Sequence, residues 1–304
     1  MNDLASFLNV IFGSILTICV TMVATMGISL IFKTSNTTNF AQGSIAAFGC
    51  YVTASLTVKF GIPYWAGIIL GILVGFGLGL LIDVGIFRRG KSVNPVGKQI
   101  ITMGIVTLIV GVIPLIFGAK EAPQIPAFVP GNFTFKIGNT DVSITYHSLV
   151  CLAITAVVMV VLFLLLYKSK WGLGVRATAS SEQTASILGI NTYVITASSW
   201  AIAAGLAVLA AVMLNAGNST LTPTFMTQIQ VNSFLSGILG GFSTFYGPVI
   251  GAVIIPLTVN IVGFFGIYAD FFLKWNEVIV YAIMLIVILI KPQGLFGKKI
   301  VKKV

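Results

Sequence analysis

Long stretches without charged side chains constrain this sequence more than any other feature. Only 8% of its 304 residues are Asp, Glu, Lys or Arg, whereas 57% are hydrophobic. A soluble globular protein carries about one quarter charged residues, because water must solvate its surface. Each uncharged stretch approaches the roughly 20 residues that a helix needs to cross the hydrocarbon of a bilayer. The sequence therefore predicts an integral membrane protein.

The apolar segments predict an all-α, polytopic helix bundle of eight or nine transmembrane segments, in a single domain of residues 1–304. These segments fall at 7–32, 41–58, 64–87, 99–118, 147–167, 193–214, 227–244, 247–266 and 275–291. The stretch 33–58 contains polar residues and glycines. It is either a full span or a broken or re-entrant one, since irregular backbone at membrane depth must be sheltered by protein or water.

Basic residues gather in short segments beside the apolar runs, and this pattern predicts the topology. The basic loops 88–98 and 168–192 and the basic tail 291–304 are expected to be cytoplasmic by the positive-inside rule. The net charge of +10 thus needs no nucleic-acid partner. The loop 119–146 is then extracytoplasmic, and its prolines and alternating apolar residues predict a short hairpin-like cap. If 33–58 spans the membrane, the amino terminus lies outside.

Glycine recurs at every fourth position of one apolar segment, at Gly67, Gly71, Gly75 and Gly79. This spacing leaves one helix face without side chains, so a neighbouring helix can approach closely. We interpret these glycines as helix-packing residues.

Two polar runs interrupt apolar surroundings, one in each half of the chain. They extend over 39–44 and 232–237. Paired interrupted helices are typical of transporters that bind their substrate near the bilayer midplane, although a purely structural role explains such runs equally well. The candidate residues for a polar path are Asn39, Gln42, Ser44, Asn232 and Ser236.

Several motifs suggest chemistry, but their context argues against it. Residues 85–92 match the phosphate-binding pattern G-x-x-x-x-G-K-[ST], yet they follow a predicted membrane helix and not a strand, so no ATP site is expected. The single histidine, His147, rules out a His-rich metal site and is expected to be a solvated helix-end residue. Asp83 is expected to reach the cytoplasmic interface together with Arg88 and Arg89. The spans offer few acids, bases or metal ligands, so neither an enzyme nor a metal site is predicted.

A short amphipathic helix is predicted in the cytoplasmic loop 168–192. Ser180 or Ser181 can begin it, Ala185 and Leu188 give it an apolar stripe, and Gly189 can end it in a left-handed turn. Such a helix either lies on the membrane surface or docks on another protein.

The chain resembles the permeases of branched-chain amino acid ABC importers, in this loop and over nearly its whole length. The resemblance includes Asn39-Phe40-Ala41-Gln42-Gly43 with Gly49 and Tyr51, the loop Gly172–Asn191, the turns Leu239-Gly240-Gly241 and Gly247-Pro248, and the closing element Lys291–Gly297. The chain departs from the family at Gln42, where a histidine is frequent, and at Ser180 and Ser181, where an acidic residue often precedes Glu182.

The resemblance implies a permease subunit of an ATP-driven importer in the bacterial inner membrane. It implies four kinds of partner: a second, homologous permease, two cytoplasmic ATPase subunits, an extracytoplasmic substrate-binding protein and the lipid bilayer. ATP and magnesium would belong to the ATPases, with no cofactor in this chain. The ATPase-docking residues that it implies are Arg176, Glu182, Gln183, Ala185, Leu188, Gly189 and Ile190.

The substrate class stays open between branched-chain amino acids and a related small polar solute such as an amide or urea. The alternative function is a stand-alone secondary carrier or channel. Against a carrier stands the scarcity of Asp, Glu and Lys within the spans, because proton- and sodium-driven transporters use such groups.

Overall fold

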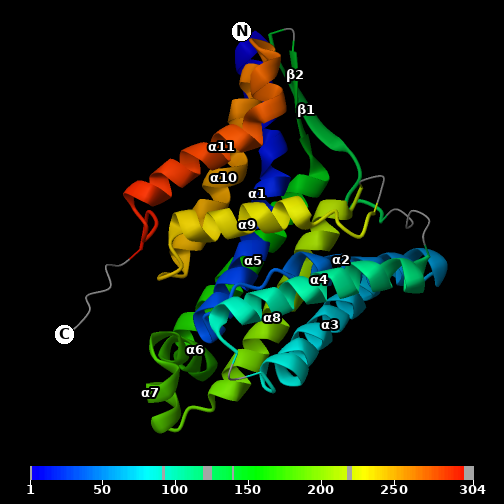
Figure 1. Ribbon diagram of the computed structural model, residues 1–304. Helices are drawn as coiled ribbons and strands as arrows, with labels where there is room; N and C mark the ends of the chain where they lie inside the picture. The colour runs from blue at the N-terminus through cyan, green and yellow to red at the C-terminus, as the bar shows by residue number, and fades with distance from the viewer. Residues whose placement is uncertain (1, 91–92, 119–124, 139, 218–220, 298–304) are drawn as a thin grey trace.

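Seven helices of spanning length make up most of the structure (Figure 1). The computed structural model describes residues 2–90, 93–118, 125–138, 140–217 and 221–297, and the count of seven refers to these ranges. The seven are α1 (Asn2–Ser35), α3 (Tyr64–Ile82), α4 (Pro95–Phe117), α5 (Tyr146–Lys168), α8 (Thr192–Asn215), α10 (Tyr246–Phe264) and α11 (Asp270–Ile290). The predicted helical membrane bundle is confirmed. The described residues form seven helices of spanning length, and not the predicted eight or nine.

Two further apolar segments form helices that are too short to span. They are α2 (Gln42–Ala54), with 13 residues, and α9 (Thr227–Gly240), with 14. At 1.5 Å per residue α9 is about 20 Å long, and α2 together with η1 (Ser55–Lys59), which continues it directly, is about 25 Å long, against roughly 30 Å of hydrocarbon. The expected broken segments therefore correspond to α2 and α9. The run 232–237 is not itself interrupted, because it lies within α9.

The remaining elements are short and lie between or at the ends of the long helices. They are the π-helical turns η1 (Ser55–Lys59) and η2 (Asp83–Phe87), the strands β1 (Asn132–Ile137) and β2 (Thr140–Thr145), the helices α6 (Lys170–Ser180) and α7 (Glu182–Ile187), and the 3-10 turn η3 (Phe265–Ile267). Strands β1 and β2 pair antiparallel, with Phe133 opposite Ile144. The predicted hairpin in the loop 119–146 is confirmed.

Helix α1 connects two opposite ends of the bundle. We call the end with β1 and β2 the hairpin end, and the end with α6, α7 and residues 88–90 and 93–98 the basic end (Figure 1). The Asn9 side chain bonds to the backbone of Asp141 and Ser143, both at 2.9 Å, at the hairpin end. Lys33 Nζ donates to the carbonyl of Ser243 at 2.8 Å at the basic end. The start of α1 thus lies opposite the basic connectors.

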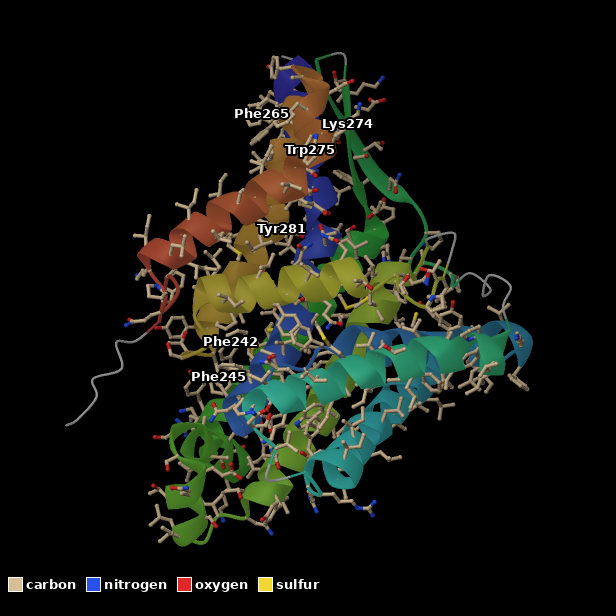
Figure 2. The ribbon with its side chains drawn as sticks, in the orientation of Figure 1. Phe242, Phe245, Phe265, Lys274, Trp275 and Tyr281 are labelled. Carbon is tan, nitrogen blue, oxygen red and sulfur yellow. The ribbon has the colours of Figure 1, made fainter. Side chains whose placement is uncertain are left out.

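Aromatic side chains lie at both of these ends. Phe265 and Trp275 lie near the start of α11 at the hairpin end, beside the basic Lys274, and Phe242 and Phe245 follow α9 near the basic end (Figure 2). Aromatic rings are enriched where a membrane meets water, because one part of the ring is apolar and another polar. The two clusters are consistent with the two faces of a bilayer.

Helices α1 and α8 form the centre of the bundle. In their most apolar windows 67% and 72% of residues are buried, against 28% or less for the other five long helices. Helix α8 is rich in alanine at its buried positions, including Ala201, Ala204 and Ala207. Small side chains let helix backbones approach closely in membranes, where packing replaces the hydrophobic effect between helices.

The glycine face of α3 packs on α2, η1 and α8. Gly67 and Gly71 face Thr57 and Thr53, and Gly75 faces Val208 of α8. A methyl group added at Gly79 would overlap the backbone carbonyl of Trp200. The glycines are therefore required by close backbone contact.

His147 is buried, so the expectation of a solvated helix-end residue is wrong. Its Nδ1 accepts a hydrogen bond from Phe128 N at 3.3 Å, and its Nε2 lies 2.9 Å from the carbonyl of Met213. Because Nδ1 acts as an acceptor, the neutral ring carries its proton on Nε2 and donates it to Met213. The histidine thus ties the start of α5 to α8.

Asp83 also differs from its prediction. Only 4% of Asp83 is exposed, and its carboxylate lies 3.8 Å from Arg88 Nε. Asp83 follows Gly79 by four residues, so it lies on the face of the helix that packs against α8. Lys91, Ser92, residues 119–124 of the outer loop and residues 298–304 of the tail lie outside the described residues.

We expect Gly79→Ala to destabilise the protein by about 1–3 kcal/mol, because the methyl group meets backbone atoms that cannot move aside. The matched control is Gly77→Ala on the same helix, where no described atom lies within 4 Å of the added carbon. Thermal unfolding in detergent measures both. Equal melting temperatures for the two variants would contradict the packing role of the glycine face.

Candidate functional site

The chain between α1 and α2 reverses direction inside the bundle. Helix α1 ends at Ser35, and the next residue, Asn36, adopts a left-handed φ of 48°. The Asn39 side-chain oxygen then accepts a hydrogen bond from Ala41 N at 2.9 Å, which holds the turn before α2. The Gln42 amide donates to the carbonyl of Ala24, three turns before the end of α1, at 3.1 Å. Helix α2 therefore begins at mid-depth and not at either end of the bundle.

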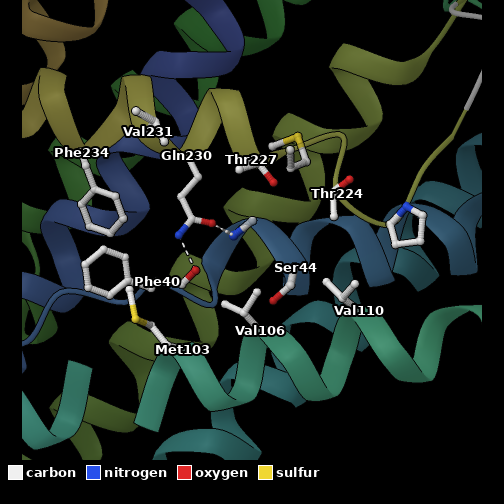
Figure 3. A pocket seen from close by; sticks show the side chains of 13 residues that line it. Phe40, Ser44, Met103, Val106, Val110, Thr224, Thr227, Gln230, Val231 and Phe234 are labelled. Carbon is white, nitrogen blue, oxygen red and sulfur yellow. Dashed lines mark hydrogen bonds between the residues drawn. The ribbon is translucent and has the colours of Figure 1, made fainter. Parts of the chain in front are cut away.

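A glutamine from α9 closes the start of α2. The first N–H groups of any helix lack partners within the helix. Gly43 N donates to the Gln230 side-chain oxygen at 2.6 Å, and the Gln230 amide nitrogen donates to the carbonyl of Phe40 (Figure 3). One side chain thus satisfies two backbone groups that would otherwise be exposed at mid-depth. Gln230 couples the two short helices directly.

A cavity of about 290 Å³ lies beside this glutamine, between α2, α4 and α9 (Figure 3). Its described walls are mostly apolar, with polar groups from Ser44, Thr224, Thr227 and Gln230. The apolar wall comprises Phe40, Met103, Val106, Val110, Pro223, Met226, Val231 and Phe234. An apolar cavity with a few placed polar groups is typical of sites for small molecules with an apolar body. Its chemistry fits an aliphatic side chain.

The five predicted path residues do not share this cavity. Only Ser44 lines it, while Asn39 and Gln42 support the turn and the start of α2. Asn232 and Ser236 lie on another face of α9, where Ser236 Oγ donates to the carbonyl of Asn232 at 2.6 Å. The roles of all five in transport stay predictions.

Asn232 belongs instead to a polar network between α9 and α11. Tyr281 OH donates to the Asn232 side-chain oxygen at 2.7 Å and accepts from the Gln228 amide at 2.6 Å. This network attaches the otherwise peripheral α11 to α9.

Sequence reasoning missed Gln230 and Gln228. Both are polar residues inside the apolar segment 227–244, the same signal that identified Asn232. The sequence could not identify the cavity wall on α4, because Met103, Val106 and Val110 do not differ from the other apolar residues of that helix.

The loop 168–192 forms two helices, α6 and α7, at the basic end. Ser181 Oγ accepts from Thr184 N at 3.2 Å and so begins α7, and Gly189 ends it with a φ of 82°. Both features were predicted. Leu188 is 74% exposed and the neighbouring Ile187, which was not singled out, is 85% exposed. The end of α7 therefore presents apolar side chains to the surroundings.

One of the two residues of the predicted apolar stripe of α7 does not lie on its exposed face. Ala185 is buried inside the protein, so it does not share a face with Leu188. Of the other predicted docking residues, Glu182, Gln183 and Gly189 are exposed, while Ile190 is half-buried. Arg176 belongs to α6, where its guanidinium lies 5.4 Å from the centre of the Tyr167 ring, away from the end of α7.

The segment after α11 closes the other end of α9. Leu295 N donates to the carbonyl of Leu239 at 2.7 Å, and Phe296 N donates to that of Gly240 at 3.2 Å. These bonds satisfy carbonyls that the end of a helix leaves free. The glycines of the closing element are needed here, because a side chain at Gly294 would meet the backbone of Gly241.

Comparison with known proteins gives consistent matches over nearly the whole chain. A family model described as "Branched-chain amino acid transport system / permease component" matches residues 10–289. A Methanocaldococcus jannaschii protein described as a probable branched-chain amino acid transport permease protein LivH is 29% identical over 280 residues, which cover 90% of this chain and 87% of the relative.

Two bacterial relatives cover even more of the chain. The high-affinity branched-chain amino acid transport system permease protein BraD of Pseudomonas aeruginosa is 26% identical over 290 residues, and LivH of Escherichia coli K12 is 24% identical over 288. Each alignment covers 92% of both proteins. No solved structure matches this chain.

We expect Gln230→Ala to loosen the start of α2. Each buried backbone group left without a partner costs about 1–3 kcal/mol, and 1.4 kcal/mol corresponds to tenfold. Hydrogen exchange at the amides of residues 42–44 should therefore accelerate about tenfold to a hundredfold. Tyr281→Phe is the control, because it breaks the α9–α11 network but not the bond to Gly43. Unchanged exchange in Gln230→Ala would contradict the coupling of α9 to α2.

Proposed function

We propose a mechanism of import for this chain. Its premise is that the chain belongs to the family of branched-chain amino acid transport permeases, whose model covers residues 10–289. The protein is a multi-pass membrane subunit of an ABC transport system and not its ATPase. The substrate, the route and the partners are proposals. They rest on the family and on the chemistry of the two short helices.

The proposed substrates are branched-chain amino acids. The relatives from P. aeruginosa and E. coli carry the names of high-affinity branched-chain amino acid permeases, and we extend that substrate class to this chain. The cavity between α2, α4 and α9 supports the extension. Its wall of valine, methionine and phenylalanine side chains suits a branched aliphatic group, and its hydroxyl and amide groups suit the polar part of the solute.

One observation carries the proposed route: α9 exposes polar side chains at membrane depth. Thr227 is exposed in the single chain, Gln228 is exposed beside its bond to Tyr281 OH, and Gln230 bonds to the mid-depth start of α2. Lipid hydrocarbon offers such groups no hydrogen bonds, so they face protein or a water-filled path. A second, homologous permease that covers this face would convert the half-open cavity into an enclosed path.

The proposed energy source is a pair of cytoplasmic ATPases that dock on α6 and α7. ATP and magnesium would be held by those subunits. The positive-inside rule favours the basic end as the cytoplasmic side, so the hairpin end faces the substrate-binding protein. ATP-driven motion of α7 would then shift the bundle around the path. We place the complex in the plasma membrane of a prokaryote, specifically the inner membrane of a bacterium.

A cavity-filling variant tests the route. Val106→Phe places a ring in the cavity, so we expect leucine uptake by vesicles that contain the full complex to fall about tenfold, with a smaller effect on alanine. Val157→Phe is the control, since Val157 is 62% exposed on α5, away from the cavity. Equal uptake in the two variants would place the route elsewhere.

A charge-reversing variant tests the docking surface. We expect Glu182→Lys combined with Leu188→Asp to abolish substrate-stimulated ATP hydrolysis, because a cation and a carboxylate replace exposed residues at the two ends of α7. The permease should still insert, and co-purification of the ATPase should be lost. Lys136→Asp changes an exposed charge at the hairpin end and should leave ATPase binding intact. Normal stimulation in the α7 variant would refute the docking assignment.

Vesicles that contain this chain alone decide between the proposal and the stand-alone carrier. We expect no uphill uptake of leucine under an imposed proton or sodium gradient, and uptake only when the ATPases, the second permease and the binding protein are present. Gradient-driven accumulation by the single chain would establish a carrier instead.

A further inference from the structure

A pocket of about 340 Å³ opens at the basic end, where α1, α5, α6 and the start of α10 meet. Its lining brings together residues that are far apart in the chain, including Lys33, Tyr167, Arg176, Ser180, Ser243 and Tyr246. Two of its described lining residues are basic and none is acidic, so we call it the cationic pocket. It shares no described lining residue with the α2–α4–α9 cavity.

The other cavity at the basic end, of about 180 Å³, differs in its charges. Its described lining includes Asp83 and Glu182, and Asp83 pairs with Arg88. That cavity therefore holds acids beside its basic groups. In the cationic pocket, by contrast, no described carboxylate forms an ion pair with Arg176. Positive charges gathered in one pocket without an acid attract an anion.

The two basic side chains are held by aromatic rings at the walls of the pocket. The Lys33 ammonium lies 4.5 Å from the centre of the Phe245 ring and donates to the carbonyl of Ser243. The Arg176 guanidinium lies 5.4 Å from the centre of the Tyr167 ring. Among the described residues only its Nε makes a hydrogen bond, at 3.4 Å to the carbonyl one turn earlier in α6. The Nη donors of Arg176 are therefore available to an occupant.

An apolar track on α5 leads to this pocket. Val160, Leu164 and Tyr167 recur at helical spacing, so they share one face, and they are 58%, 54% and 45% exposed. In the membrane such a face meets lipid tails. Tyr167 at its end and Tyr246 across the pocket, also 45% exposed, are residues typical of the level at which lipid headgroups begin. The pocket thus lies beside the headgroups, with hydrocarbon along α5.

We propose that the cationic pocket binds the headgroup of an anionic phospholipid from the cytoplasmic leaflet. Its phosphate would accept charge-assisted hydrogen bonds from Arg176 and Lys33, and the exposed hydroxyls of Ser180 and Tyr246 would bond to the rest of the headgroup. One acyl chain would lie along the α5 track. Basic pockets between membrane helices on the cytoplasmic side are typical sites for such headgroups. A free phosphate would match the charges but leave the apolar track without a partner.

The position of the pocket gives the lipid a role. It would join the end of α1, the end of α5 and the start of α10 to α6. Only Ser181 separates α6 from α7, so a lipid that holds α6 also positions the helix that we assign to ATPase docking. This consequence rests on the proposed function, whereas the lipid site rests on the charges and the apolar track.

Native mass spectrometry of the full chain, released from detergent micelles with added lipid, tests the site. We expect one dioleoyl-phosphatidylglycerol to bind at least about tenfold more tightly than dioleoyl-phosphatidylcholine, whose headgroup carries no net charge. Inorganic phosphate and glycerophosphoglycerol, the headgroup without acyl chains, should each compete at least about tenfold less well than the intact lipid, because neither covers the apolar track.

Variants of the chain locate the lipid. Arg176→Gln and Lys33→Gln should each weaken phosphatidylglycerol binding about tenfold, because each removes a charge-assisted bond. Glutamine keeps a hydrogen-bond donor at both positions. Arg176→Lys keeps the charge and should weaken binding less than Arg176→Gln. The matched control is Lys274→Gln, an exposed basic residue at the hairpin end, which should leave binding unchanged (Figure 2).

Four outcomes would overturn the proposal. They are equal binding of the two phospholipids, equal competition by glycerophosphoglycerol, which would assign the pocket to a free anion, an equal effect of Lys274→Gln and Arg176→Gln, and an Arg176→Gln variant that keeps the lipid but loses the ATPase. The last result would return Arg176 to the docking surface. Conversely, Arg176-dependent lipid binding by a chain whose complex takes up no leucine would support this site and refute only the proposed function.

Discussion

Every feature of this structure depends on one constraint: backbone N–H and C=O groups at membrane depth need partners within the protein. Within the long helices, these groups bond to one another along the helix. The two short helices cannot bond all of theirs in this way, because their ends lie inside the bundle or close against it. Gln230 supplies the partners at the start of α2, and the segment after α11 supplies them at the end of α9. The polar side chains of the interior are thus required by the broken helices before they serve any transport function.

Close packing around α1 and α8 makes this arrangement rigid. Alanine on α8 and glycine on α3 bring backbones together, and the π-helical turns η1 and η2 end α2 and α3 with a wider spiral. One consequence is that Asp83 is carried into the interior beside Trp200. A second is that α11 remains at the periphery, where the Tyr281 network joins it to α9. Membrane bundles of this kind leave their peripheral polar faces for a partner to cover.

The two cavities differ in the polarity of the side chains that line them. The cavity beside Gln230 lies at mid-depth and is mostly apolar, so it suits the passage of an aliphatic side chain with few tight contacts. A second cavity, at the basic end, is lined by charged side chains of both signs. Helix α7 borders it through Glu182 and exposes Ile187 and Leu188 outward.

The sequence alone determined the membrane class, the hairpin, the end of α7 at Gly189 and the glycine spacing, because hydrophobic length, strand alternation and helical spacing are local properties. The resemblance carried by residues 39–43, 172–191 and 291–297 determined the family. The tertiary structure alone decided that α2 and α9 are too short to span, that Gln230 joins them, and that His147, Asp83 and Ala185 are buried. These outcomes depend on which residues meet across separate helices. A polar residue within an apolar helix gives the same sequence pattern whether it faces lipid, a cavity or the backbone of another helix.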